Sequence, residues 1–138
     1  MLTKIDHIGI VVNDLKTRVK KYTSVLGLEV KEIEEVNVEN VINRVAFLPI
    51  GETNIELVQT TANTGLAADF LKERGEGIHH IAFEVKDLNK TFQELRSRGV
   101  EFIWNKIING SRGSTVAFIK PEELGGVYIE LVQKHQKG

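Results

Sequence analysis

Two stretches of the chain share one pattern of apolar and polar positions. KIDHIGIVVNDL, residues 4–15, and GIHHIAFEVKDL, residues 77–88, are identical at six of twelve positions. Each stretch alternates between apolar and polar residues and then changes to a helical spacing, which predicts a strand followed by a helix. The expected helix caps are Asp14 and Asp87 at the starts and Gly27 and Gly99 at the ends.

The segments that follow are also similar to each other. RVAFLPIGETNIELVQ, residues 44–59, resembles TVAFIKPEELGGVYIELVQ, residues 115–133, and both end in ELVQ. Each half therefore predicts one strand, one helix and three more strands, with a short helix at about Leu66–Arg74 between the halves. The later strands are expected at 28–36, 44–49 and 54–59, and at 100–104, 115–119 and 127–132.

This order predicts an α+β fold built from two tandem βαβββ modules. The first module covers about residues 4–60, the linker with its helix about 61–76, and the second module about 77–133. A chain of 138 residues is long enough to bury a core as one domain. We therefore expect a single domain over residues 1–138.

One histidine of each module is expected to face away from its helix. Strand side chains alternate between faces, and Ile8 and Ile10 belong to an apolar row suited to packing under the helix. His7 then lies on the opposite face. By the same count, His79 joins the apolar row of the second module, whereas His80 takes the position equivalent to His7.

A glutamate interrupts the apolar alternation in the last strand of each module, at Glu56 and Glu130. A buried carboxylate is costly to ionise, and two together repel each other unless a cation lies between them. Two imidazoles and two carboxylates suit a divalent first-row ion with positions open to water or substrate. The predicted ligands are His7, Glu56, His80 and Glu130, and the alternatives are metal-free His–Glu pairs or strand edges that face water.

Composition and net charge limit the classes of partner that we expect for the chain. The net charge of −1 gives no general attraction to nucleic acid or anionic membranes. The absence of cysteine excludes disulfides and thiolate metal sites. No secretory signal or 18-residue apolar run occurs, so we expect a cytoplasmic protein with neither nucleic acid nor membrane as a partner.

The duplicated strings, above all GIHHIAFEV and GGVYIEL, resemble the vicinal oxygen chelate, or glyoxalase/bleomycin-resistance, superfamily over about residues 5–133. Within it, the chain is most similar to the methylmalonyl-CoA epimerase family. The resemblance implies a cup-shaped eight-stranded mixed sheet with helices outside, often in a homodimer. It also implies the same four ligands and one divalent ion per chain, Co²⁺ above Zn²⁺, Mn²⁺ or Ni²⁺.

The reaction that the resemblance implies is interconversion of the 2R and 2S epimers of methylmalonyl-CoA. A proton leaves C2 and the metal stabilises the resulting enolate. Glu130 is the expected acid/base residue as well as a ligand. A second base is not found, because the glutamate that some relatives carry is replaced in VINRVAF by Asn43 and Arg44, which leaves water or Glu39.

Contacts to the acyl-CoA substrate are harder to assign. The turn KPEELGG, residues 120–126, has two glutamates where relatives often have a basic turn. The remaining candidates for substrate or phosphate contacts are Arg44, Lys106, Arg112 and Lys120. The alternative functions are a lactoylglutathione lyase-type isomerase and a non-catalytic small-molecule-binding protein of the same fold.

Overall fold

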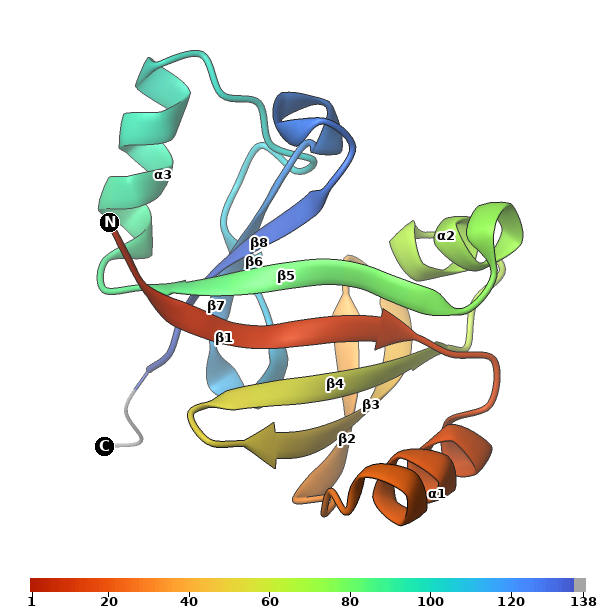
Figure 1. Ribbon diagram of the computed structural model, residues 1–138. Helices are drawn as coiled ribbons and strands as arrows, with labels where there is room; N and C mark the ends of the chain where they lie inside the picture. The colour runs from red at the N-terminus through yellow and green to blue at the C-terminus, as the bar shows by residue number, and fades with distance from the viewer. Residues whose placement is uncertain (136–138) are drawn as a thin grey trace. The chain divides into compact units, whose positions relative to one another are not determined.

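A computed structural model describes residues 1–135 of the chain. Its eight strands form one mixed sheet in the order β2-β3-β4-β1-β5-β8-β7-β6. The elements (Figure 1) are β1 (Leu2–Val11), α1 (Leu15–Leu26), β2 (Glu32–Val38), β3 (Val41–Ile50), β4 (Thr53–Thr60), α2 (Leu66–Arg74), β5 (Gly77–Val85), α3 (Leu88–Ser97), β6 (Ile108–Asn109), β7 (Thr115–Ile119) and β8 (Tyr128–Gln133), with short 3₁₀ helices at Ser111–Gly113 and Pro121–Leu124. The predicted α+β fold of two βαβββ modules is confirmed.

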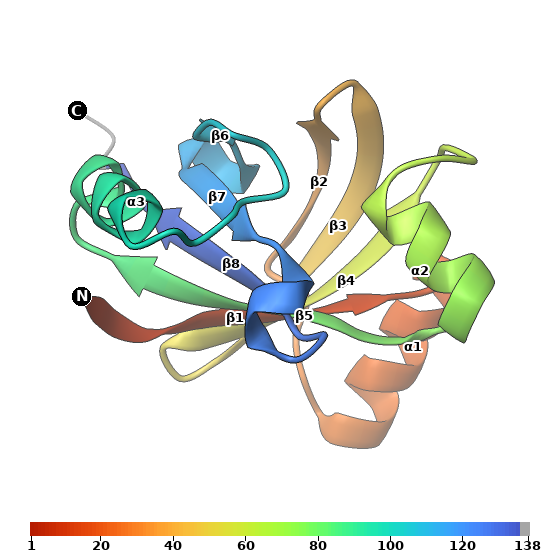
Figure 2. The ribbon, with the colours of Figure 1, turned by 90° about the horizontal axis from the view of Figure 1, so that it is seen from above.

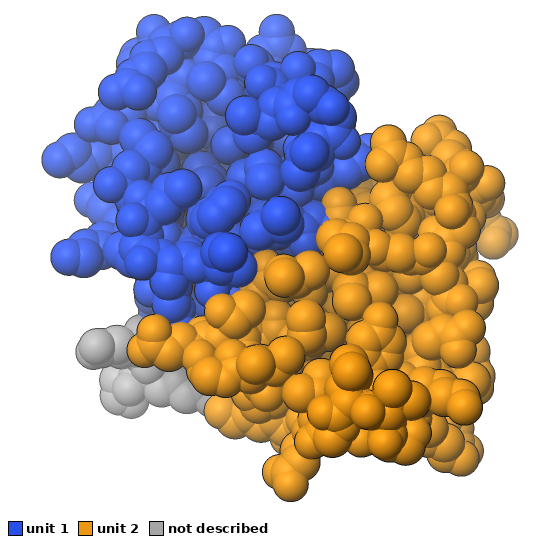
Figure 3. Space-filling view, in the orientation of Figure 1, with its two compact units in different colours: residues 1–6, 80–138 blue, residues 7–79 orange. Residues whose placement is uncertain are grey.

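The chain divides into two compact units (Figure 3). One consists of residues 1–6 and 80–138, and the other of residues 7–79. The division falls within β1 and β5, just before the histidine in each strand. Each unit therefore contains one histidine strand, its helix and the strands that follow.

In the unit of residues 7–79, β1 runs parallel to β4, and β4, β3 and β2 pair antiparallel in turn. Helix α1 packs against one face of these strands (Figure 1). Its Leu15 joins a buried cluster with Val12 and Leu57, and Ile10 packs at the margin of that cluster. The predicted apolar row under the first helix is therefore confirmed.

In the other unit, β5 runs parallel to β8, and β7 pairs antiparallel with β8. Helix α3 covers one face of these strands (Figure 2). Its Phe92 lies in a buried cluster with Val85 and Leu131, against which Phe83 packs. Both modules thus place their helix on the face to which the odd-numbered apolar residues of the last strand point.

The strand expected over 100–104 is wrong. That segment forms an isolated bridge between Phe102 and Ile119, and the short strand β6 lies later, at Ile108–Asn109. Phe102 is buried and its ring lies 4.5 Å from that of Phe92 in α3. Ile103 still donates its N–H to the carbonyl of Phe118 at 2.8 Å. Pairing in this segment is thus limited to the bridge at Phe102, where the N–H of Lys120 also donates to the carbonyl of Glu101 at 3.0 Å.

Other boundaries differ less. The strand expected at 28–36 is β2, which begins at Glu32 and ends at Val38. Leu28 and Val30 pack instead at the margin of the core under α1. The linker helix has the predicted bounds. Among the described residues, no helix is long and apolar enough to cross a membrane.

Candidate metal centre

His7 and Glu56 form a buried pair within the unit of residues 7–79. The ladder between β1 and β4 pairs Gly9 with Glu56, so His7, two residues before Gly9, shares a face with the glutamate. Nδ1 of His7 lies 3.1 Å from Oε2 of Glu56, and the two side chains are only 4% and 7% exposed. This face is the one opposite α1, as the alternation predicted.

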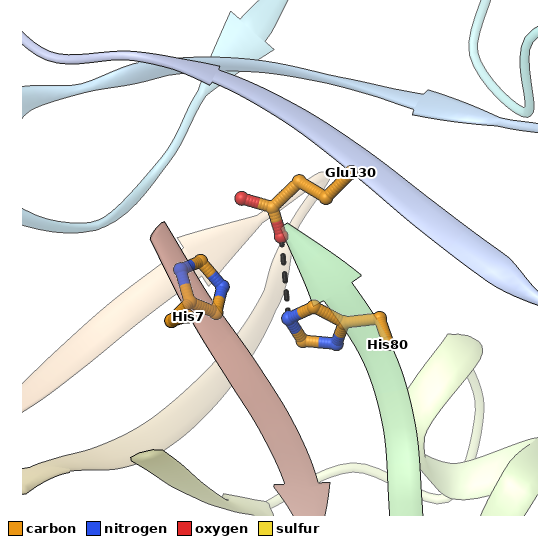
Figure 4. Close-up of side chains that lie close together, drawn as sticks. All are labelled: His7, His80 and Glu130. Atoms are coloured by element: carbon orange, nitrogen blue, oxygen red, sulfur yellow. Dashed lines mark ion pairs between the residues drawn. The ribbon is translucent and has the colours of Figure 1, made fainter. Parts of the chain in front are cut away.

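His80 and Glu130 repeat this arrangement in the other unit. The ladder between β5 and β8 pairs Ala82 with Glu130, which again places the histidine two residues before the partner of the glutamate. Nε2 of His80 lies 3.3 Å from Oε1 of Glu130, with 10% and 8% of the side chains exposed. Figure 4 shows this ion pair.

A phenylalanine stands beside each glutamate in the next antiparallel strand. Phe47 of β3 is the ladder partner of Glu56, and Phe118 of β7 is the ladder partner of Glu130. The ring of Phe118 meets that of His80 edge-on at 6.1 Å, and Trp104 packs edge-on against Phe118 at 5.6 Å. Each His–Glu pair therefore has an apolar neighbour that limits its access to water.

His79 occupies a different environment from His80. Its ring is buried and meets the ring of Phe70 in α2 edge-on at 5.1 Å. Burial, with a smaller contribution from the charge of Arg74, lowers the pKa of His79 to about 4. The side chain is therefore a neutral packing residue, on the helix-packed side as the alternation predicted, although the helix that it meets is α2.

Two of the predicted substrate contacts, Arg44 and Lys120, lie on different strands or turns of the fold. Arg44 is exposed and pairs in the ladders with Gln59 and Glu35, on the face of β3 opposite Phe47. Lys120 forms an ion pair at 2.7 Å with Glu101, and the hydrogen bond to this carboxylate, together with its charge, raises the pKa of the lysine.

Two further candidates lie in the segment between the Phe102 bridge and β7. Lys106 is exposed, and Arg112 is partly buried in the 3₁₀ turn with a left-handed backbone, at φ 56°. The suggested alternative base, Glu39, is exposed in the two-residue turn between β2 and β3.

A buried aspartate went unpredicted. Asp6 precedes His7 in β1 and is 4% exposed. Its Oδ1 lies 2.8 Å from Nζ of Lys134. An acidic residue directly before a candidate ligand was the available signal.

Comparison with known proteins identifies the family. Residues 6–118 match the model of the Glyoxalase/Bleomycin resistance protein/Dioxygenase superfamily. The chain belongs to this superfamily. It is 35% identical over 132 residues to the Bacillus subtilis protein YqjC, covering 96% of this chain and 93% of YqjC. It is 31% identical over 133 residues to human mitochondrial methylmalonyl-CoA epimerase, covering 96% of this chain and 74% of that protein.

A solved structure of the superfamily is similar throughout. A variant of Streptomyces coelicolor methylmalonyl-CoA epimerase, in complex with 2-nitronate-propionyl-CoA, superposes with a TM-score of 0.90 and 34% identity. The match covers 97% of this chain and 96% of that one. The superfamily assignment therefore rests on sequence and on the whole of the fold, and relates the chain to methylmalonyl-CoA epimerases at moderate identity.

Proposed function

We propose that His7, Glu56, His80 and Glu130 together hold one divalent metal ion. The proposal is supported by the two buried His–Glu pairs, at 3.1 and 3.3 Å, which share one ladder register. Ligands that each lie about 2 Å from one ion are separated from one another by roughly 3 to 4 Å. The His–Glu separations within each module, 3.1 and 3.3 Å, fall in this range.

The chemistry of the donor set fits such an ion. Two nearly buried carboxylates are costly without compensating positive charge, and a divalent cation compensates both at once. Imidazole and carboxylate together suit Co²⁺, Zn²⁺, Mn²⁺ or Ni²⁺, and four protein ligands leave room for a substrate oxygen. The family resemblance favours Co²⁺ among these ions.

We further propose that the chain epimerises methylmalonyl-CoA at C2. The similarity to methylmalonyl-CoA epimerases over 96% of the chain supports this substrate. The observation that carries the proposal is the pair of buried His–Glu contacts, one in each module. The resemblance also leads us to propose a homodimer. Sedimentation measurements test the dimer.

The bound ion and Glu130 have different roles in this reaction. The bound ion supplies a Lewis acid for the thioester and carboxylate oxygens of the substrate. Glu130 takes the proton from C2, and the electron pair of the broken C–H bond moves into the thioester carbonyl to give an enolate. A proton from another donor is added to the opposite side of C2, and the proton held by Glu130 then passes to the deprotonated donor. The centre is inverted without any net change in atoms or electrons.

The donor of the proton added to C2 is proposed to be water. Asn43 shares the face of Phe47 and Glu56, according to the ladder of β3 with β4, but an amide does not titrate as a base. Arg44 lies on the other face, and a guanidinium group is a poor base. A water molecule hydrogen-bonded to the Asn43 amide, whose buried Oδ1 has no partner among the described residues, fulfils this role.

A comparison of two substrates tests this function. Purified protein loaded with Co²⁺ is incubated with 2S-methylmalonyl-CoA and, separately, with the hemithioacetal of methylglyoxal and glutathione. We expect epimerisation of the first and no turnover of the second. Turnover of the hemithioacetal alone identifies a lactoylglutathione lyase-type isomerase, and ligand binding without turnover of either identifies a binding protein.

A further inference from the structure

The glutamine that ends each ELVQ string contacts the helix that follows the histidine strand. Oε1 of Gln59, in β4, accepts a hydrogen bond from the backbone N–H of Leu15 at 2.7 Å. Oε1 of Gln133, in β8, accepts one from the backbone N–H of Leu88 at 2.8 Å. Leu15 and Leu88 are the first residues of α1 and α3. The same bond therefore occurs once in each module.

These bonds satisfy helix N–H groups that need a partner. The first N–H groups of a helix have no acceptor within the helix. In α1, the Asp14 side chain accepts from the Thr17 hydroxyl and makes no cap bond to the described backbone, so Gln59 supplies an acceptor there. In α3, Asp87 accepts from the N–H of Lys90. Gln133 therefore serves a different N–H from the one that the cap residue serves.

Each glutamine lies three residues after a proposed ligand glutamate. Residues three apart in a strand point to opposite faces, so Glu56 lies on the face of His7 while Gln59 reaches back to α1. Strand β4 thus carries a proposed metal ligand on one face and, on the other, a glutamine that is hydrogen-bonded to the helix. Glu130 and Gln133 repeat this division in β8.

Each glutamine hydrogen bond connects the end of the glutamate strand to the helix that follows the histidine strand. The relative register of these two strands determines where the histidine and the glutamate meet. In the first module, the ladder from His7 to Val11 continues through the N–H of Val12, which donates to the carbonyl of Val58 at 2.9 Å. The Gln59 bond is the next link along the same pair of segments. A slip of two residues keeps every side chain on its face but moves a glutamate by roughly 6.6 Å. Metal–ligand distances tolerate only about 0.2 Å.

We propose that Gln59 and Gln133 are positioning residues of the metal site. Each fixes the strand of a ligand glutamate to the start of the helix that follows the strand of its partner histidine. The inference rests on the proposed function, because it assumes that the two His–Glu pairs bind a metal. Neither glutamine is a ligand, since both point to the helix-covered face.

The test measures Co²⁺ affinity of the metal-free full chain by titration of the visible absorption of bound Co²⁺. Gln59→Met and Gln133→Met keep the length of the side chain but remove the oxygen acceptor. We expect each to weaken Co²⁺ binding by about tenfold, as is usual for groups that orient metal ligands. Gln59→Glu and Gln133→Glu restore a carboxylate acceptor at a helix N-terminus, which is favourable there, and should bind within a few-fold of the unsubstituted chain.

Matched controls separate positioning from general stability. Thr17→Val and Asp87→Ala remove side-chain hydrogen bonds at the starts of the same helices without touching β4 or β8. They should lower the thermal midpoint and leave Co²⁺ affinity unchanged. Equal losses of affinity in the controls, or unchanged affinity in both Met variants, would overturn the positioning role alone. Failure of the unsubstituted chain to bind Co²⁺ would overturn the metal site as well.

Amide hydrogen exchange gives a second readout. The proposal predicts slow exchange at the N–H groups of Leu15 and Leu88, which the glutamines accept. In each Met variant, exchange should quicken at the affected amide while the neighbouring helix stays protected. Fast exchange at both amides in the unsubstituted chain would contradict the proposed role of the two glutamine hydrogen bonds.

Discussion

His7 and Glu56 lie on neighbouring parallel strands, with Nδ1 3.1 Å from Oε2 and with Gly9 as the ladder partner of the glutamate. His80, Ala82 and Glu130 repeat this relationship in the second module. A duplication that preserves strand register therefore also preserves the pairing of an imidazole with a carboxylate.

The first prediction concerns the side-chain requirement at position 56. Glu56→Leu removes one oxygen ligand and should weaken Co²⁺ binding by at least about 100-fold, a loss of roughly 3 kcal/mol in binding free energy. Glu56→Gln keeps an oxygen of similar reach, and the resemblance allows glutamine at this position. It should therefore retain measurable binding. Isothermal titration of both variants checks the prediction, which fails if Leu and Gln behave alike.

Substitution of the adjacent histidines, His79 and His80, should have different effects on metal binding and on stability. His80→Ala is expected to abolish Co²⁺ binding, because it removes the imidazole beside Glu130. His79→Ala should instead lower the free energy of unfolding by about 2 kcal/mol, since a buried ring against Phe70 is lost. Metal titration and chemical denaturation of both variants measure the two effects. Swapped outcomes would contradict the assignment of the strand faces.

Glu130 and Arg44 should contribute unequally to catalysis. Glu130→Gln removes the proposed base and should lower epimerisation by at least about 100-fold, within the usual range for acid/base groups. Arg44→Gln alters an exposed residue on the opposite face of β3 from Phe47 and Glu56, and should leave the rate near that of the unsubstituted chain. The epimerisation rate of Co²⁺-loaded protein is the measurement. Comparable losses would mean that the chemistry lies elsewhere.

The pair of Glu76 with Arg18 predicts a pH dependence of stability. Hydrogen bonds from Nε and Nη2 of Arg18, at 3.0 and 2.9 Å, lower the pKa of Glu76 below its ordinary value of 4.5. The stabilisation is therefore present above pH 4.5 and is lost as the pH falls through the lower pKa of the folded state.

Glu76→Gln should lower the thermal midpoint by a few degrees at pH 7 and have less effect at pH 3. Thermal unfolding across this range measures the difference. An effect of Glu76→Gln that grows as the pH falls would show that the ion pair does not account for the shift.

The sequence predicted those parts of the fold that local patterns determine. Alternation around His7 and Glu56 assigned the strand faces correctly, and the bounds of the linker helix at Leu66–Arg74 were correct. Both depend on residues close together in the chain. The sequence similarity of the two modules helped as well, because the pattern in each module supported the strands and helix predicted for the other.

Features that depend on distant contacts were missed. The segment at residues 100–104 pairs only at Phe102, which also packs on Phe92 of α3, a contact that alternation within the segment does not reveal. The bond between Gln59 and Leu15 joins residues 44 positions apart. Its signal was the repeated glutamine of ELVQ, whose role became visible only when the helix start and the strand end were placed side by side.

Proton exchange at C2 tests the central claim most directly. Purified protein is incubated with methylmalonyl-CoA in heavy water, before and after removal of metal with a chelator, and deuterium at C2 is followed by mass spectrometry. We predict rapid incorporation together with epimerisation, loss of both after chelation, and recovery of both when Co²⁺ is added back. Exchange that survives complete removal of metal, or no exchange in the Co²⁺-loaded protein, would contradict the account.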